Sequence, residues 1–470
     1  MNSYKIHTHF AGRVIVIGFG SIARASMPLL NRHLNIDRER ITIISPETIG
    51  DVDANQFGEY VKVALTRENY LDVLTPLVAS GDVVLNLAVD VSSVDVIKFC
   101  QRVGALYLDT GIDPWAGAYR DAALSPSARS NYALREGALA LRGRGAATAV
   151  LTHGANPGLV SHFVKAALMQ VARDAGRDVD VPTDRDGWAQ LACLLGVKVI
   201  HIAERDTQTL SRSKRDGEFI NTWSVDGFLA EGCQPSELGW GSHERHFPHD
   251  ASRHAFGCDA ALYLTRPGAS VRVRSWTPLS GPYHGFLITH CESISLADYF
   301  TVRGSKGEIV YRPTVHYAYH PCDAAILSIH ELAGRNWQPQ DSKTIAFADI
   351  HRGEDALGVL IAGHERNALW YGSVLDVEQA RSLAPYNNAT SLQVAVGVLA
   401  GVVWAIENPN EGVVDPEYVD HVRALEIATP YLGSIRCEYT EWNPTVGRGM
   451  LFEETVDQSD PWQFLNVRVT

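Results

Sequence analysis

The chain has 470 residues, of which 46% are hydrophobic and 20% are charged. A chain of this length and composition can bury large cores, which excludes a disordered or fibrous protein and predicts two or three domains. The formal net charge of −13 disfavours nucleic acid as a partner, because phosphate binding depends mainly on Lys and Arg. A cationic ligand fits this charge balance better.

The seven cysteines are scattered, without a Cys-x-x-Cys pair. This spacing disfavours a disulfide framework and a zinc ribbon, so we expect reduced thiols and no metal site. The first ten residues are polar and rich in His, unlike a secretory leader, and Gly or charged residues interrupt the apolar runs before membrane-spanning length. We therefore expect a cytoplasmic protein with no membrane partner.

Short apolar runs alternate with helical patterns over the first 150 residues. The strands are expected at 13–18, 41–44, 60–65, 82–88, 105–108 and 147–151. Helices are expected at 22–34, 68–79 and 92–102. Apolar strands separated by helices are typical of a parallel sheet that is covered on both faces. The pattern predicts an α/β fold with a Rossmann-type doubly wound parallel sheet, forming an NAD-binding domain over residues 1–153.

The pattern changes after residue 153, where loops become longer. A helix is expected at 159–171, followed by strands at 197–203, 270–274, 286–295 and 307–312. Residues 226–256, rich in Gly, Pro and His, are expected to lie outside the core. We interpret 154–385 as a substrate and dimerisation domain of α+β type with a mixed sheet, and 386–470 as C-terminal helices and a tail that pack back on the other domains. The apolar helices expected at 391–407 and 415–429 favour a homodimer.

The first strand runs into the loop Gly18-Phe19-Gly20-Ser21-Ile22-Ala23. In a dinucleotide-binding loop the first Gly permits the tight turn, the second lets the backbone approach a pyrophosphate, and small Ala23 lets the helix pack on the strand. The free N–H groups at the helix start then face the negative charge. A lone Gly-x-Gly-x-x-Ala also occurs in ordinary turns, but here it lies between a strand and a helix. We expect Gly18, Gly20, Ser21, Ile22 and Ala23 to bind a dinucleotide.

The second strand ends in Ser45-Pro46-Glu47. Glu47 is the candidate for the acid that binds the ribose, although it lies later than the usual spacing of about 20 residues from the loop. No Arg follows this strand closely, which favours NAD over NADP.

Three polar residues follow expected strands of the first domain, at the sheet edge where ligands enter such folds. Asp90 follows the fourth strand, Asp113 the fifth, and Asn156 the sixth. A helix cap explains Asp90 or Asn156 equally well, and a turn explains Asp113. The functional alternative for Asn156 is a side-chain amide aimed at the nicotinamide or at a substrate amine.

The second domain carries two carboxylates and an indole that suit a cation. Glu204 ends an apolar strand, and Trp223 and Glu231 follow it. Carboxylates bind ammonium groups by charge-assisted hydrogen bonds, and Trp binds them through its ring face. A surface Glu and a core Trp are the ordinary alternatives. His290, at the end of the strand expected from Phe286, is a candidate for proton transfer near neutral pH or else a structural histidine.

The loop 18–23, the Gly154-Ala-Asn-Pro-Gly158 segment, the series Glu204, Trp223 and Glu231, and the strand ending at His290 together resemble bacterial homospermidine synthase. The resemblance covers essentially the whole chain, and more broadly the arrangement is similar to the saccharopine dehydrogenase-like reductases. The phosphate loop is common to many enzymes, whereas the second-domain series is far more specific.

The resemblance implies a transferase that holds NAD as a prosthetic group and joins two putrescines, or spermidine and putrescine, into homospermidine. It places Asn156, Glu204, Trp223, Glu231, His290 and Asp355 in the diamine pocket, with Asp90 and Asp113 beside them. Trp223 is implied to hold a cationic intermediate by cation–π attraction, and Glu231 and Asp355 to bind ammonium groups. The implied path oxidises an amine-bearing carbon, exchanges ammonia for a second diamine, and returns the hydride.

Two other functions remain open from the sequence. An oxidoreductase of the saccharopine or carboxynorspermidine type binds an amino-acid carboxylate and needs Arg or Lys in its pocket, for which Arg205 is the neighbouring candidate. A catalytically silent NAD-binding sensor needs none of the acidic and aromatic series.

Overall fold

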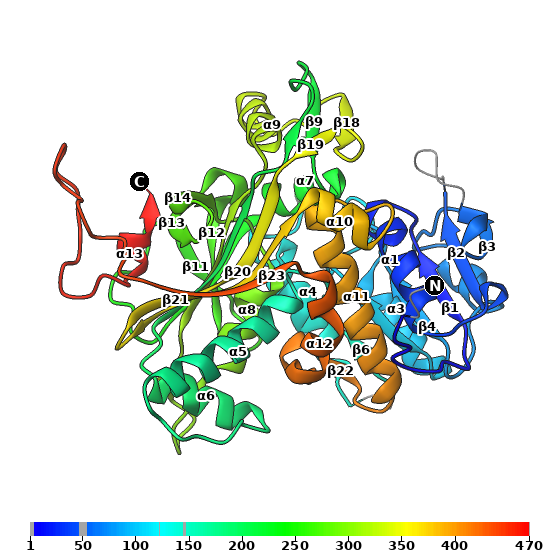
Figure 1. Ribbon diagram of the computed structural model, residues 1–470, viewed down its shortest axis with the longest axis horizontal. Helices are drawn as coiled ribbons and strands as arrows, with labels where there is room; N and C mark the ends of the chain where they lie inside the picture. The colour runs from blue at the N-terminus through cyan, green and yellow to red at the C-terminus, as the bar shows by residue number, and fades with distance from the viewer. Residues whose placement is uncertain (1–3, 47–53, 122, 144–146, 470) are drawn as a thin grey trace.

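The computed structural model describes residues 4–46, 54–121, 123–143 and 147–469 of the chain. Two large sheets, with helices packed on and between them, make up the fold (Figure 1).

The first sheet has seven parallel strands in the order β22-β6-β5-β4-β1-β2-β3. They are β1 (Val14–Ile17), β2 (Ile41–Ser45), β3 (Glu59–Lys62), β4 (Val83–Asn86), β5 (Leu106–Asp109), β6 (Ala149–Val150) and β22 (Val413–Val414). Strands β1, β2, β4 and β5 are buried at every residue, because helices cover both faces of the sheet. The expected Rossmann-type sheet is confirmed.

The helices α1 to α4 precede the second sheet in the chain. They are α1 (Ser21–His33), α2 (Tyr70–Leu74), α3 (Ser93–Val103) and α4 (Asn131–Leu139). A fifth helix, α11 (Ala389–Glu407), comes from the C-terminal part of the chain and packs against α1 and β5. Since β22 also belongs to this part, the chain returns to the first sheet after building the second.

Helix α11 is long and apolar enough to cross a membrane by length and composition alone, so the expectation that every apolar run is too short was wrong for this segment. In the structure 89% of its most apolar window is buried inside the fold. Figure 1 shows it in orange, running between the two halves of the molecule.

The second sheet has 11 strands and is mixed, as the sequence predicts. Strands β7 and β17 lie side by side and parallel in its middle, whereas β7 pairs with β20, and β20 with β21, in antiparallel fashion. The strands are β7 (Val199–Asp206), β10 (Pro235–Gly239), β11 (Ala251–Arg253), β12 (Ala261–Pro267), β13 (Arg272–Thr277), β14 (Gly281–Phe286), β17 (Thr314–His320), β20 (Glu354–His364), β21 (Asn367–Asp376), β23 (Ser434–Thr440) and β24 (Arg468–Val469).

Three small two-stranded sheets and eight helices complete this half. The sheets pair β8 (Thr209–Leu210) with β19 (Ile350–Arg352), β9 (Glu218–Asn221) with β18 (Ser342–Ile345), and β15 (Val302–Arg303) with β16 (Ile309–Tyr311). The helices are α5 (Leu159–Asp174), α6 (Arg185–Leu194), α7 (Val225–Cys233), α8 (Cys291–Tyr299), α9 (Asp323–Gly334), α10 (Val377–Leu383), α12 (His421–Ala428) and α13 (Phe464–Val467).

The strand expected at 286–295 was wrong. Strand β14 ends at Phe286, and the chain then forms α8, for which His290 is the residue before the first turn. Eight of the nine residues of α8 are buried, including Glu292, Ser293 and Ser295, so the helix has no solvent-exposed polar face. A short apolar run without such a face cannot be told from a buried strand by periodicity.

The expectation that 226–256 lies outside the core was also wrong for its first half. Helix α7 begins where Ser224 Oγ accepts a hydrogen bond from the Gly227 N–H at 3.0 Å. Strand β10 follows and pairs with β12 and β17 inside the second sheet. Glycines and polar residues concealed these elements, because Ser236 and Glu237 are fully buried and hydrogen-bonded.

Candidate active site

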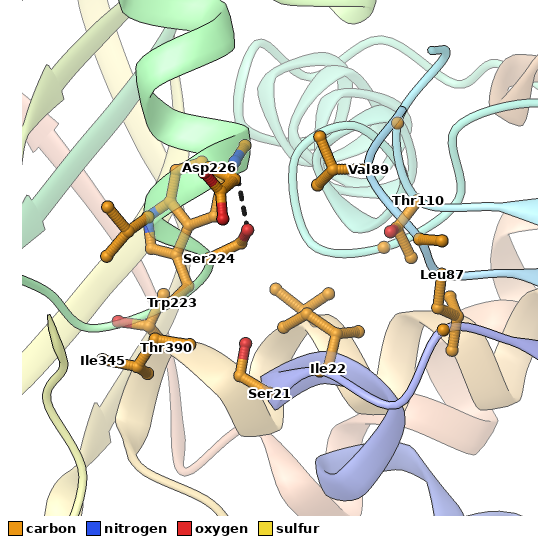
Figure 2. A pocket seen from close by; sticks show the side chains of 18 of the residues that line it. Ser21, Ile22, Leu87, Val89, Thr110, Trp223, Ser224, Asp226, Ile345 and Thr390 are labelled. Atoms are coloured by element: carbon orange, nitrogen blue, oxygen red, sulfur yellow. Dashed lines mark hydrogen bonds between the residues drawn. The ribbon is translucent and has the colours of Figure 1, made fainter. Parts of the chain in front are cut away.

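A cavity of about 1180 Å³ lies between the two halves of the molecule. One wall comes from the ends of β1, β2, β4 and β5, and the other from β7, α7, β17 and the 343–349 segment. Figure 2 shows Ser21 and Ile22 facing Trp223, with Val89 and Thr110 opposite. The cavity therefore lies at the carboxyl ends of the parallel strands, where ligands bind in such folds.

The phosphate loop forms the first wall. Gly18 has φ +91°, and a Cβ there would lie 2.9 Å from the Ala88 backbone. Gly20 is the residue before α1, and a Cβ there would meet nothing within 4 Å. Ala23 is fully buried in the core. The first N–H groups of α1 lack helical partners, so this loop forms an open cradle that fits the pyrophosphate of a dinucleotide.

The far end of this cradle holds Ser45 and Pro46, which follow β2 and line the cavity. Glu47, the candidate for binding the ribose, lies outside the described residues. Arg24, one turn into α1, also lines the cavity and is a cation that the sequence reasoning did not consider.

Asp90 and Asp113 line the same cavity. Asp90 has φ +67° and does not cap α3, because Ser92 takes that place and accepts from the Asp95 N–H at 3.3 Å. Asp113 accepts a hydrogen bond from the Tyr119 hydroxyl at 3.0 Å. Burial, together with the nearby carboxylates of Asp90 and Glu231, raises the pKa of Asp113 to about 8, although the hydrogen bond from Tyr119 lowers it. The protonated form of Asp113 is therefore favoured at neutral pH.

Asn156 connects the two halves. It does not cap α5, since Gly158 precedes that helix. Its side-chain amide instead donates to Glu204 and, at 2.7 Å, to the Tyr317 hydroxyl, and Tyr317 donates to Glu204 in turn. Burial raises the pKa of Glu204 to about 7, although both hydrogen bonds lower it. The structure thus brings a carboxyl group that titrates near neutral pH to the cavity wall.

Two more carboxyl groups lie behind Glu204. Asp206 is two residues along β7, and Asp355 of β20 lies opposite it in the sheet. Both are fully buried. Asp355 accepts from the Thr390 hydroxyl at 2.7 Å, while its Oδ1 has no partner among the described residues. Burial and then the charges of Glu204 and Asp206 raise its pKa well above the usual value.

Asp355 does not itself line the cavity, whereas Thr390 does. Unlike the other described candidates for the diamine pocket, it therefore lies one side chain behind the wall. From there it reaches the site only through the Thr390 hydroxyl, which donates to its carboxyl group.

Trp223 lies on the second-domain wall, facing the phosphate loop (Figure 2). Its Nε1–H donates to the Tyr319 hydroxyl at 3.0 Å, and its ring packs on Phe228 with centroids 5.5 Å apart. Tyr319 stacks on Tyr317 at 5.1 Å. These contacts fix the indole with a ring face available to a cation in the cavity.

His290 lies between two carboxylates. Its Nε2 is 3.1 Å from Glu231 and its Nδ1 is 3.1 Å from Glu292. Burial lowers the pKa of His290, but the charges of Glu292 and Glu231 outweigh burial and raise it well above the usual value. The imidazolium form of His290 is therefore favoured, which leaves Glu204 as the candidate proton acceptor of this wall.

Sequence reasoning missed Tyr317, which lines the cavity, and Asp206, Glu292 and Tyr319, which lie behind the lining residues. A signal was present for three of them. Asp206 is two residues from Glu204, and the two tyrosines alternate in the run 314–320, as side chains on one face of a strand do. Glu292 carried no such signal, because its helix was read as a strand.

Comparisons with known proteins agree with this arrangement. Residues 14–151 match the saccharopine dehydrogenase NADP binding domain, and residues 154–438 match the saccharopine dehydrogenase C-terminal domain. Saccharopine dehydrogenase from Saccharomyces cerevisiae shares the fold at a TM-score of 0.51 and 11% identity, covering 92% of this chain and 100% of that one.

Three relatives are far more similar. The homospermidine synthase of Blastochloris viridis is 50% identical over 100% of both chains, and that of Mesorhizobium japonicum is 47% identical over 99% of this chain and 98% of its own. The crystal structure of the homospermidine synthase from Legionella pneumophila, in complex with NAD, has a TM-score of 0.93 at 47% identity and covers 100% of each chain. With an NAD-type cradle facing an acidic and aromatic wall, and with this similarity over its whole length, the chain belongs to the homospermidine synthase family.

Proposed function

We propose that this protein is a homospermidine synthase that transfers an aminobutyl group between two putrescines, or between spermidine and putrescine. The observation that carries the proposal is the placement of Glu204, Trp223 and Glu231 on one cavity wall, opposite the phosphate loop. Diamines and their iminium derivatives are cations. Carboxylates and an indole in a partly buried cavity stabilise cations more strongly than water does.

The basic residues of the cavity support a diamine over an amino acid. Lys343 lines the rim but pairs with Asp226, and Arg24 belongs to the phosphate-loop helix. Arg205 does not line the cavity, since its guanidinium donates to the Asp206 and Pro321 carbonyls. A substrate carboxylate would therefore find no unpaired Lys or Arg among the described residues of the acidic wall, whereas the saccharopine-type reaction requires one.

NAD is the proposed cofactor, held at Gly18, Gly20, Ser21 and Ile22, with Ala23 packing the helix behind the loop. When bound, NAD accepts a hydride from the amine-bearing carbon of one diamine and returns it to the new imine. The L. pneumophila relative, solved with NAD, supports this assignment. Glu47 remains the proposed ribose ligand.

The acidic wall would hold the substrate by its two ends. Glu231 binds one ammonium group, while His290 between Glu231 and Glu292 fixes the direction of that carboxylate. Asp90 and Asp113 add two further carboxyl groups on the first-domain side of the cavity. Asp355 holds the Thr390 hydroxyl of the wall by a hydrogen bond from behind. Trp223 stabilises the iminium carbon through its ring face.

Glu204 is the proposed proton acceptor. An amine must lose a proton before it gives up a hydride or attacks a carbon, and a general base works best with a pKa near the ambient pH. The pKa of Glu204, raised to about 7 by burial, meets this condition. Asn156 and Tyr317 direct the carboxylate by hydrogen bonds.

The exchange at the iminium carbon forms one C–N bond and breaks another. The second diamine forms a C–N bond to the iminium carbon, and the original C–N bond breaks with its electron pair leaving on nitrogen. That nitrogen departs as ammonia, and the new imine receives the hydride. No net oxidation or reduction results.

Incubation of the purified protein with putrescine and NAD, without added reductant, tests the proposal. We expect homospermidine and ammonia in equal amounts and no net NADH. Accumulating NADH would instead indicate a dehydrogenase, and retained NAD without turnover would indicate a sensor. Trp223→Ala should keep the fold and the NAD but lose most of the activity, while comparable turnover would contradict the cation–π role.

We also propose a homodimer. Met450, Leu451 and Phe452 are consecutive and are 83%, 89% and 82% exposed, on a C-terminal segment that extends from the second domain (Figure 1). Contiguous exposed apolar residues mark interaction sites. Light scattering on the wild type should give twice the chain mass, and Leu451→Asp should weaken the assembly. A monomeric wild type would contradict this.

A cytoplasmic location is proposed as well. All seven cysteines are free in the structure, as in proteins of a reducing compartment. Cell fractionation with activity measured in each fraction tests it, and activity confined to a membrane or secreted fraction would contradict it.

A further inference from the structure

A second, much smaller cavity of about 40 Å³ lies directly behind the acidic wall. It shares five lining residues with the large cavity, namely Gly111, Asp113, Gly227, Glu231 and His290. The side chains of Asp113, Glu231 and His290 are therefore the partition between the two spaces.

The size of this cavity excludes a diamine. A water molecule needs a cavity volume of roughly 10–15 Å³, so this cavity holds about three molecules of that size. Ammonia and ammonium are as small as water. A four-carbon chain with two amines does not fit.

The lining is rich in hydrogen-bond acceptors. Gln234 is 3% exposed, and its side-chain Oε1 has no hydrogen-bond partner among the described residues. Its backbone is fixed, because its N–H donates to the Ala230 carbonyl at 3.1 Å and its carbonyl accepts from the Gly268 N–H at 2.9 Å. The carboxyl groups of Asp113 and Glu231 face the same space.

Two donors of the lining are already committed. The Tyr119 hydroxyl donates to Asp113 at 3.0 Å and lies 2.9 Å from the Ile112 carbonyl, and His290 donates to Glu231. No Lys or Arg is among the lining residues, all of which are described. A buried acceptor without a partner costs free energy unless a ligand or water supplies the donor. The cavity therefore fits a small molecule that carries several N–H donors.

We propose that this cavity is a binding site for the nitrogen released in the reaction, which it accepts as ammonia and holds as ammonium on Gln234 and Asp113. The inference rests on the proposed function. When the original C–N bond breaks, the large cavity still holds the cofactor and the newly joined polyamine, so the space behind Glu231 is the free place next to the wall. The ammonia takes a proton from the Asp113 carboxylic acid, which leaves ammonium beside a carboxylate.

The experiment uses the NAD-loaded enzyme with putrescine and ¹⁵N-labelled ammonium chloride. Labelled ammonia that reaches the iminium carbon replaces the original nitrogen, so the return of the hydride gives ¹⁵N-putrescine. Mass spectrometry measures the ratio of label incorporation to homospermidine formation. Gln234→Leu should lower this ratio about tenfold, because the acceptor is lost while the diamine site stays intact.

Two variants make the result specific. Gln340→Leu is the matched control, because Gln340 is also buried and its Oε1 also lacks a partner, but it lies outside both cavities. It should leave the ratio unchanged. Gln234→Glu keeps an acceptor and adds negative charge, so its ratio should equal or exceed that of the wild type. This variant keeps the proposal testable if Gln234→Leu fails to fold.

The outcomes are distinct. An unchanged ratio in Gln234→Leu, or an equal fall in Gln340→Leu, would overturn the ammonium site while homospermidine formation by the wild type still supported the synthase. A low ratio in Gln234→Glu would overturn it too. A wild type that forms no homospermidine would refute the proposed function, and this inference would fall with it.

Discussion

The wall that the first domain gives to the cavity is built from backbone and small side chains, whereas the second-domain wall is built from buried carboxyl groups and aromatic rings. In the phosphate loop the geometry of Gly18 and Gly20 matters, and any larger side chain would fill the cradle. On the other wall Glu204 and Trp223 act through their side chains, which hydrogen bonds hold in place.

The difference fits what each wall is proposed to bind. An anionic pyrophosphate is bound by N–H groups that every residue carries, so the protein needs only to leave room. A cationic diamine needs negative charge, and buried carboxylates are costly unless neighbours stabilise them. The second wall therefore depends on many residues in contact, and its properties change with pH, while those of the cradle do not.

The largest expected effect comes from removing the charge of the second wall at Glu204. Glu204→Gln keeps the shape and the hydrogen bonds but loses the proton acceptor, so kcat/KM for homospermidine formation should fall about 10³-fold, within the usual range for a general base. NAD content should stay the same. Initial rates and the absorbance of bound NAD check both expectations.

Stability separates this role from a structural one. Burial raises the pKa of Glu204 in the folded state to about 7. Its protonated form therefore stabilises the fold fully below the pKa of the unfolded state, and this contribution is lost as pH rises through 7. Glu204→Gln avoids this loss and should melt no lower than the wild type at pH 8. Glu438→Gln, a half-buried change on β23, is the control and should leave the rates unaltered. A large loss of stability in Glu204→Gln would contradict the catalytic role.

The cradle gives the next effect. Gly20→Val should fold normally, because nothing in the protein lies within 4 Å of the added Cβ, yet the side chain enters the space of the pyrophosphate. Overpacking of about 1–3 kcal/mol predicts NAD binding weakened roughly 5- to 150-fold. Calorimetric titration of NAD into the stripped protein measures it.

Gly18→Ala provides the contrast within the same loop. Gly18 has φ +91°, and an added Cβ would lie 2.9 Å from the Ala88 backbone, so Gly18→Ala strains the folded state. The melting temperature of Gly18→Ala should therefore fall, whereas that of Gly20→Val should not. Equal behaviour of the two variants would contradict the separation of turn geometry from cofactor space.

The two walls also differ in how far the sequence predicts them. The cradle is local: a strand, a loop and a helix within 20 residues carry the whole signal, and the structure places these elements within one or two residues of the prediction. The second wall joins Asn156, Glu204, Trp223 and His290 from four separate elements. Only the resemblance grouped them in advance, because residue types alone do not say which distant segments meet.

The failures of the sequence reading have the same cause. Glu292 was missed because the buried helix α8 has no exposed polar face, so its sequence resembled a strand. Asp355 was assigned to the pocket, but its register opposite Asp206 places it behind Thr390. The pKa values of Glu204 and His290 could not be predicted at all, because they depend on burial and on neighbours distant in the chain.

A smaller effect is expected at Trp223. Trp223→Leu keeps an apolar side chain of substantial size but removes the ring, so the loss of a desolvated cation–π interaction of about 2 kcal/mol predicts kcat/KM lowered roughly 30-fold. Trp223→Phe retains an aromatic ring, so its kcat/KM should lie between those of the wild type and Trp223→Leu. NAD binding should not change in either variant. A Phe variant as impaired as the Leu variant would argue for the indole N–H bond to Tyr319 instead.

The finest test of the second wall is its pH dependence. Glu204 must be ionised to accept a proton, so log kcat/KM should fall as pH decreases through about 7, the value to which burial raises its pKa. Tyr317 donates a hydrogen bond that stabilises the ionised form. Removing that donor in Tyr317→Phe should move the acid limb to higher pH by roughly one unit, because hydrogen bonds to a carboxylate lower its pKa. A rate profile from pH 5.5 to 9 with saturating NAD would measure the shift. Tyr311→Phe is the matched control, since its hydroxyl donates to the Val197 carbonyl at 2.8 Å and does not line the cavity. An acid limb that stays in place in Tyr317→Phe, or that moves equally in the control, would mean that a group other than Glu204 accepts the proton.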